Sequence, residues 1–253
     1  MMQIPVPTPR RVLRGLLFAL AGLLALSTLG RLAQRHLPDF VGRDRLAELF
    51  WILESAGAAT LFGMMVLLVA AALAFLAAAD AERTQARGWR GVGMVLAALG
   101  VDELFGGYED VTDRLSDLLL GPLSNAVAWI VWGFVAVAVV GVLLVRFAWR
   151  LPRRTGQRLV AAAAVFVVGA VGLEILSKVV AGVAGSRSWL FVAVTTLEEG
   201  LELLGGVLAL WAIYSHLYER WDAVTFRRAR RPEAVVGAVS PTVDSRPPGG
   251  PAV

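Results

Sequence analysis

The stretch Ser188–Leu217, SWLFVAVTTLEEGLELLGGVLALWAIYSHL, decides the fold class of this chain. It is apolar and long enough to cross a bilayer, since a spanning helix needs about 20 mostly apolar residues. Three acids, Glu198, Glu199 and Glu202, nevertheless stand in its middle. An ionised acid at that depth costs about 2.5–3.5 kcal/mol on insertion scales. The stretch therefore predicts a transmembrane helix in which each acid is protonated, paired with a cation, or in contact with water.

The composition of the whole chain is that of a membrane protein. Of its 253 residues 57% are hydrophobic and 17% are charged, whereas soluble domains carry about 25% charge. Cysteine is absent, which excludes disulfides, thiolate metal sites and thiol catalysis. The arginines stand between apolar segments instead of forming one stripe with interleaved aromatic residues, so the net charge of +4 does not indicate nucleic-acid binding.

Apolar segments of spanning length recur along the chain, which predicts an all-α fold: a polytopic six-transmembrane-helix bundle. The predicted segments are Val12–Leu32, Leu49–Ala79, Trp89–Phe105, Leu123–Val145, Leu159–Ala184 and Trp189–Leu217. The first resembles a secretory signal but lacks a clear cleavage site, so we expect an uncleaved helix. Tryptophans favoured at membrane interfaces fall near the predicted ends, at Trp51, Trp89, Trp149, Trp189 and Trp221.

Arginines beside the segments predict the orientation, because short cytoplasmic loops are enriched in them. They gather before the first segment, in the second–third and fourth–fifth connections, and after the sixth segment. These are Arg10, Arg11, Arg14, Arg83, Arg87, Arg90, Arg146, Arg150, Arg153, Arg154, Arg158, Arg220, Arg227, Arg228, Arg230 and Arg231. The first–second connection departs from the pattern, with Arg31, Arg35, Arg43 and Arg45. Both termini are predicted to be cytoplasmic.

The chain divides into one transmembrane domain, 1–228, and a tail, 229–253, whose Pro, Gly and Ser content predicts a disordered cytoplasmic extension. Arginine far outnumbers lysine, and alanine, glycine and valine are abundant, which suggests a GC-rich bacterial genome. The expected location is therefore the bacterial cytoplasmic (inner) membrane, as a multi-pass protein.

Acids from four predicted helices fall at similar depth. At about 1.5 Å of rise per residue, they lie in the outer half of the bilayer, with Glu202 just past the middle. The other acids of this layer are Glu54, Asp102, Glu103, Glu174, Glu198 and Glu199. Lys178 follows Glu174 by four residues, the favourable order for a helical ion pair. We predict a polar pocket in the outer half, bounded by the second, third, fifth and sixth helices.

Two acidic segments carry a family resemblance. VDELFGGYED (101–110) resembles a D-E-x4-H-E segment, and TTLEEGLELLG (195–205) resembles an E-E-x-x-E-x-x-G segment. Both occur in a widespread group of uncharacterised bacterial multi-helix membrane proteins, and the likeness extends to WILESAGAATLF (51–62) and GLEIL (172–176). The motif positions implied by the resemblance are Asp102, Glu103, Glu109, Glu174, Glu198, Glu199 and Glu202. Tyr108 stands where the group has histidine, which weakens a histidine-ligated metal.

The first functional hypothesis is that these acids bind a cation or protons, for transport or sensing. A hard divalent ion such as Mg²⁺, Mn²⁺ or Ca²⁺ is the candidate cofactor, held by the seven motif acids, with Glu54, Tyr108 and Lys178 in the same polar pocket. The expected partners are the lipid bilayer and a small cation or proton.

Two alternatives stay open: a membrane-embedded metal-dependent or acid/base enzyme, and a structural protein whose protonated acids hydrogen-bond neighbouring helices. His36 and His216 have no second ligand at useful spacing and are expected to be ordinary polar residues. The hydroxyls of Ser177, Thr195 and Thr196 are expected to bond main-chain carbonyls.

Overall fold

A computed structural model describes residues 6–36, 57–105, 125–186 and 188–221, which form helices with no strand among them. This confirms the all-α class. The helices are α1 (Pro9–His36), α3 (Ala58–Asp80), α4 (Arg83–Phe105), α6 (Asn125–Ala148), α7 (Arg153–Val167), the π-helix η1 (Val168–Leu173), α8 (Glu174–Ala184) and α9 (Trp189–Arg220). Because α7, η1 and α8 follow one another without a break, they form one continuous rod.

Four of the described helical segments are long and apolar enough to cross a membrane, as expected for a membrane protein. They are Pro9–Leu29, Ala58–Asp80, Arg153–Ala184 and Trp189–Arg220. α6 contributes a shorter apolar helix over Phe134–Ala148. α4 falls outside this set because arginines occupy its first turns and acids its last.

The helix boundaries differ from the predicted segments mainly at polar ends. α4 begins at Arg83 and not at Trp89, since the Arg, Gln and Ala residues before Trp89 are good helix formers. Trp89 therefore lies inside the helix and not at its start, and its side chain is fully buried. The start of the second predicted segment, 49–56, lies outside the described residues, and α3 begins at Ala58.

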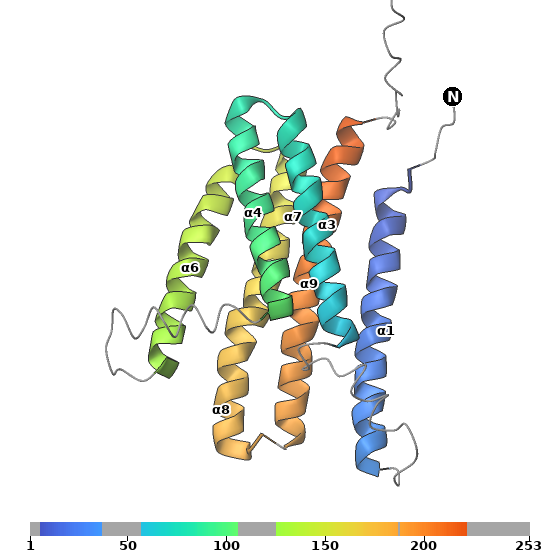
Figure 1. Ribbon diagram of the computed structural model, residues 1–253, viewed down its shortest axis with the longest axis vertical. Helices are drawn as coiled ribbons and strands as arrows, with labels where there is room; N and C mark the ends of the chain where they lie inside the picture. The colour runs from blue at the N-terminus through green and yellow to red at the C-terminus, as the bar shows by residue number, and fades with distance from the viewer. Residues whose placement is uncertain (1–5, 37–56, 106–124, 187, 222–253) are drawn as a thin grey trace, which may run out of the picture.

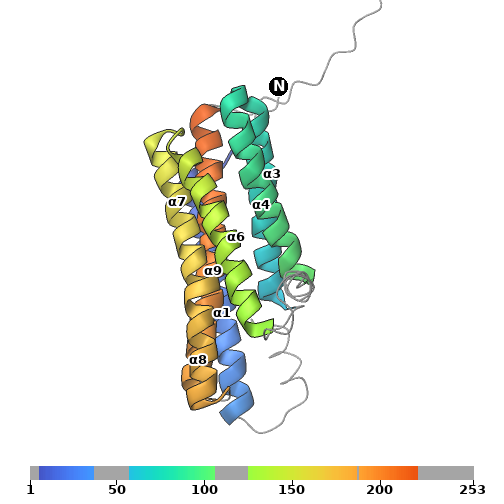
Figure 2. The ribbon, with the colours of Figure 1, turned by 90° about the vertical axis from the view of Figure 1, so that its left-hand side faces the viewer.

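The helices run nearly parallel or antiparallel, and α9 occupies the centre (Figure 1). α9 contacts α1, α3, α7, η1 and α8, while α6 contacts α7 and α4. Turned by 90°, the bundle shows α3 and α4 together on one side and the α7–α8 rod with α9 on the other (Figure 2). The acid-bearing helix identified from the sequence thus contacts most of the other helices, while α4 packs on α3.

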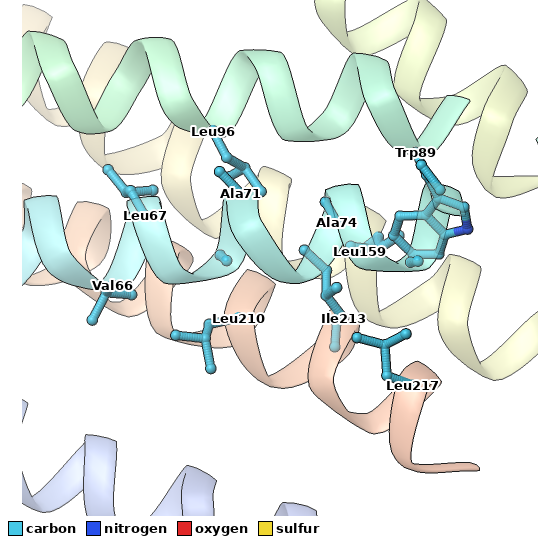
Figure 3. Packing of buried hydrophobic residues seen from close by; sticks show 14 of the residues in the cluster. Val66, Leu67, Ala71, Ala74, Trp89, Leu96, Leu159, Leu210, Ile213 and Leu217 are labelled. Carbon is cyan, nitrogen blue, oxygen red and sulfur yellow. The ribbon is translucent and has the colours of Figure 1, made fainter. Parts of the chain in front are cut away.

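Small residues allow this close packing. Ala70 and Ala74 on α3 are completely buried, as are Val207 and Ile213 on α9. Figure 3 shows Leu67, Ala71 and Ala74 of α3 lying between Leu96 of α4 and the α9 side chains Leu210 and Ile213. Interfaces rich in small residues are typical of membrane helices, because they let two backbones approach.

The arginine-rich helix ends lie at the same end of the bundle, which we call the arginine end: the start of α1, the α3–α4 and α6–α7 turns, and the end of α9 (Figure 1). Side chains connect these segments there. Asp80 Oδ2 accepts hydrogen bonds from Arg220 Nε at 3.1 Å and from Trp221 Nε1 at 3.2 Å. Gln85 Nε2 donates to the main-chain oxygen of Arg150 at 3.3 Å.

The opposite end holds the α8–α9 hairpin. α8 is followed by Gly185, whose φ of 83° is a left-handed conformation that glycine adopts without strain. Ser188 then caps α9, because its Oγ accepts a hydrogen bond from the Phe191 amide at 3.1 Å. The hairpin holds the acid-bearing parts of α8 and α9 side by side.

Candidate functional site

Two acids from helices far apart in the sequence line one pocket inside the bundle. Glu103 comes from α4 and Glu202 from α9. The space open to the centre of a water molecule is about 10 Å³, so the pocket can hold about one water. Its lining residues are Gly63, Val66, Leu67, Glu103, Phe166, Glu202, Leu203 and Gly206. Among these described lining residues none is basic, so the two carboxyl groups face mainly apolar surroundings.

A glycine on α3 provides the room for the Glu103 carboxyl group. A Cβ atom on Gly63 would lie 3.0 Å from Glu103 Oε1 and 2.9 Å from Leu203 Cδ2. Both distances are shorter than the contact of about 3.5–4.0 Å that carbon atoms prefer. Any larger residue at this position would therefore displace Glu103 or Leu203.

The π-helix η1 packs closely against the acid-bearing turns of α9. A Cβ atom on Gly169 would lie 2.9 Å from both the Glu198 main-chain oxygen and the Glu202 main-chain nitrogen, and 3.0 Å from Glu202 Cγ. One turn of α9 further on, Gly205 approaches Phe166 so closely that a Cβ atom would lie 2.6 Å from Phe166 Cβ. π-Helical turns inside α-helices are rare and occur frequently at functional sites.

A second polar group lies on the α8 side of α9. Lys178 Nζ forms an ion pair with Glu174 Oε1 at 3.0 Å, which confirms the predicted i, i+4 pair. Lys178 projects outward, with 57% of its side chain exposed. The buried Ser177 donates to the Glu174 main-chain oxygen at 2.9 Å, and its hydroxyl is in hydrogen-bonding range of Glu198.

The pocket and this second group are electrostatic neighbours. Glu202 is close enough to Glu103, Glu174, Glu198 and Glu199 for their charges to act on it. Glu198 in turn is influenced by Glu174 and Lys178. Its Oε2 atom is buried and has no hydrogen-bond partner in the described part of the chain.

The remaining predicted residues divide into two sets. Asp102 and Glu199 are half-buried beside the pocket acids, and both interact with neighbouring groups. Glu54, Tyr108 and Glu109 lie outside the described residues.

Within the described ranges no group of three or more His, Asp or Glu side chains is arranged to hold a metal ion. The predicted divalent-metal site therefore gains no support from these residues.

The hydroxyls near the acids bond main-chain carbonyls, as expected. Thr195 Oγ1 donates to the Phe191 oxygen at 3.0 Å, and Thr196 Oγ1 donates to the Val192 oxygen at 2.7 Å. His216 lies near the arginine end of α9, where its Nδ1 is 3.4 Å from Thr155 Oγ1 and its ring is 5.0 Å from that of Trp89. Trp89 and Thr155 are fully buried, so His216 belongs to the packing of that end and not to the acidic pocket.

Sequence reasoning missed the glycines that shape the site. Gly63, Gly169 and Gly205 each stand inside an apolar helical pattern, where glycine is costly relative to alanine and often has a packing reason. That signal was present. The π-helical turn of η1 has no comparable signature in VGAVGL.

The apolar helices, packed through small residues around a centre that contains acids, define this chain as a multi-helix membrane protein. It belongs to the family described as "Domain of unknown function (DUF8692)", which matches residues 15–217. The matched range includes Glu103, Glu174, Glu198 and Glu202. No curated protein and no solved structure is recognisably similar to the chain.

Proposed function

We propose that this protein crosses the bacterial cytoplasmic membrane six times, with both termini in the cytoplasm, and that its central acids bind and exchange protons in proton-coupled transport or sensing. The observation that carries the proposal is the pocket shared by Glu103 and Glu202. The two residues come from different helices, and they meet in an apolar pocket without a basic residue among its described lining.

The topology is supported by the gathering of arginine-bearing helix ends at one end of the bundle (Figure 1). Positive residues beside spanning segments favour the cytoplasmic side. The spanning segments then alternate in direction, in the order α1, α3, α4, α6, the α7–α8 rod and α9. This alternation places the α8–α9 hairpin on the outer side of the membrane. In this orientation the Glu174–Lys178 pair lies near the outer surface, because about 1.5 Å of rise per residue separates Lys178 from the end of α8 at Ala184 by roughly 9 Å.

Protons suit this site better than a divalent ion. A metal of this class takes about six or more oxygen ligands, whereas the pocket has room for about one water and two described carboxyl groups line it. Two ionised carboxylates would repel each other, and each would lose its hydration in hydrocarbon. One proton on either carboxyl group removes the repulsion, and a proton on each removes the charge that hydrocarbon would leave without hydration.

The second polar group, formed by Glu174, Ser177 and Lys178, offers a route for protons from the pocket to the outer side of the membrane. The single proton of the Ser177 hydroxyl is donated to the Glu174 main-chain oxygen at 2.9 Å. The Ser177 hydroxyl is also within hydrogen-bonding range of Glu198, so it lies between Glu198 and Glu174. Glu202, Glu198 and Glu174 follow one another toward Lys178, whose exposed ammonium group ends the series.

Infrared absorption tests proton binding directly. The full chain is reconstituted in lipid, and the carbonyl stretch of protonated carboxyl groups is recorded at neutral pH. We expect this band in the wild type and a smaller band in Glu202→Gln. Glu219→Gln is the matched control, because Glu219 is an exposed acid on the same helix that pairs with Arg158 at 3.3 Å. Identical spectra for the wild type and Glu202→Gln would refute proton binding at the pocket.

Proton flux then separates a coupled function from a structural one. Liposomes containing a pH-sensitive dye are loaded with wild type, Glu202→Gln or Glu219→Gln, and an imposed pH gradient is followed. Flux that is lost only in Glu202→Gln supports transport. If the acids are protonated but no proton flux is seen, sensing or a structural role remains. Metal analysis of the same samples adds a check: a bound divalent ion that disappears in Glu202→Gln would replace the proton proposal with the cation one.

A further inference from the structure

The turn between α6 and α7, at the arginine end, concentrates positive charge that no acid of the described residues pairs with. Its sequence, WRLPRR, spans residues 149–154, and Arg146 lies one helical turn before it. Arg146, Arg150, Arg153 and Arg154 are all exposed. None of the four forms an ion pair within the described ranges, although Arg158 and Arg220 nearby are paired with Glu219 and Asp80.

The backbone that carries these arginines is firmly anchored. Phe147 is 7% exposed and packs edge-on against Trp89, with ring centroids 5.3 Å apart. Leu151 is also 7% exposed and belongs to the same apolar core. Gly156 lets α7 fold back tightly, since a Cβ atom there would lie 2.4 Å from the Ala148 main-chain oxygen. A site built on fixed backbone loses less entropy when it binds a ligand.

An aromatic ring stands in the middle of this cluster. Trp149 is 82% exposed, between Arg146 and Arg150 in the sequence. Its neighbours Phe147 and Leu151 are buried, so the turn directs Trp149 away from the protein. Tryptophan side chains favour the head-group level of a bilayer, where the ring meets both lipid and water. The exposed Trp149 therefore indicates that the α6–α7 turn lies at the lipid surface.

We infer that the α6–α7 turn is a binding site for the head group of an anionic phospholipid. Arg150, Arg153 and Arg154 supply guanidinium groups, whose planar fork matches the oxygens of a phosphodiester. Trp149 packs beside the glycerol and upper acyl chain. The ligand is the lipid itself and not free phosphate, because only the lipid satisfies both the arginines and the exposed ring.

Native mass spectrometry of the full chain in detergent tests this site. Phosphatidylglycerol, phosphatidylcholine or inorganic phosphate is added in turn, and the bound fraction is measured. The triple variant Arg150→Gln/Arg153→Gln/Arg154→Gln is expected to bind phosphatidylglycerol about a hundredfold more weakly, from roughly fivefold for each arginine near an anionic surface. Trp149→Ala is expected to weaken phosphatidylglycerol binding while leaving the charge unchanged.

A control with the same loss of charge separates a site from general attraction. Arg10→Gln/Arg11→Gln/Arg14→Gln removes three arginines from the same end of the bundle, on α1. We expect this variant to weaken phosphatidylglycerol binding much less than the α6–α7 triple variant does, since it leaves the turn intact. Equal weakening in the two triple variants, or wild-type binding in both, would overturn the site. Binding of inorganic phosphate as strong as that of the lipid would overturn the assignment to a phospholipid. Circular dichroism of each variant checks that the helices are intact.

Discussion

Replacement of Gly169 by alanine tests whether the close contact between η1 and α9 shapes the acidic site. The added Cβ atom would lie 2.9 Å from two main-chain atoms of α9 and 3.0 Å from Glu202 Cγ. Carbon atoms prefer contacts of about 3.5–4.0 Å, so η1 and α9 must separate by roughly 0.5–1 Å. Neither partner can yield by a simple side-chain rotation, because the closest atoms belong to the backbone.

The expected loss of folding stability is the difference between two opposing contributions. Overpacking in a close-packed interior costs about 1–3 kcal/mol. Alanine in place of glycine within a helix stabilises the folded protein by about 0.5–1 kcal/mol. Gly172, in the same π-helix, is the matched control, because a Cβ atom there has no neighbour within 4 Å. Gly172→Ala thus measures the favourable contribution alone, and the difference between the two variants isolates the clash at about 1–3 kcal/mol.

Thermal unfolding of both variants in a mild detergent provides the measurement. For a chain of this size about 1 kcal/mol corresponds to roughly 2–4 °C in Tm. We expect Gly169→Ala to unfold several degrees below Gly172→Ala, and Gly172→Ala to match or exceed the wild type. If the two variants unfold at the same temperature, η1 and α9 are not in contact at Gly169, and the described shape of the pocket is wrong.

Three further substitutions probe the arginine end through the same unfolding measurement. Phe147→Ala removes a buried ring packed on Trp89 and should lower stability by about 3–5 kcal/mol; a loss below about 1 kcal/mol would mean that α6 is not anchored there. Thr155→Val leaves a buried nitrogen of His216 without its partner and should cost about 1–3 kcal/mol, whereas an unchanged Tm would argue against that hydrogen bond. Asp80→Asn weakens an exposed ion pair with Arg220 and should cost no more than about 1 kcal/mol, so a larger loss would show that Asp80 has a deeper role than its exposure indicates.

The sequence predicted the helices well because hydrophobicity and length are local properties. The sixth predicted segment, Trp189–Leu217, differs from α9 by three residues at its end. The Glu174–Lys178 pair was also predictable, because residues four apart on a helix are neighbours whatever else surrounds them. The sequence placed Glu103 and Glu202 at similar depth, whereas the glycines and apolar residues that line the pocket with them were not predicted.

Features that depend on contacts between helices could not be predicted. The burial of Trp89 results from Phe147 and His216, which lie far away in the sequence. Equal depth in the membrane also does not fix the direction of a side chain: Lys178 was placed in the polar pocket from its position along one helix, and 57% of its side chain is exposed. Depth follows from position along one helix, whereas direction requires the rotation of that helix against its neighbours.

The π-helical turn of η1 has a consequence for how the chain could change. A π-turn accommodates one more residue than the α-helix around it, and each residue turns a helix by about 100°. Each residue of the wider π-turn rotates the chain less, so the six residues of Val168–Leu173 turn it about as far as one residue fewer would in an α-helix; removing one residue there would restore regular winding and leave Glu174, Ser177 and Lys178 facing the same side of the rod. The π-turn thus absorbs one residue while keeping α8 in register with α9, whereas a deletion in the regular part of α7 would turn the outer acids by about 100°.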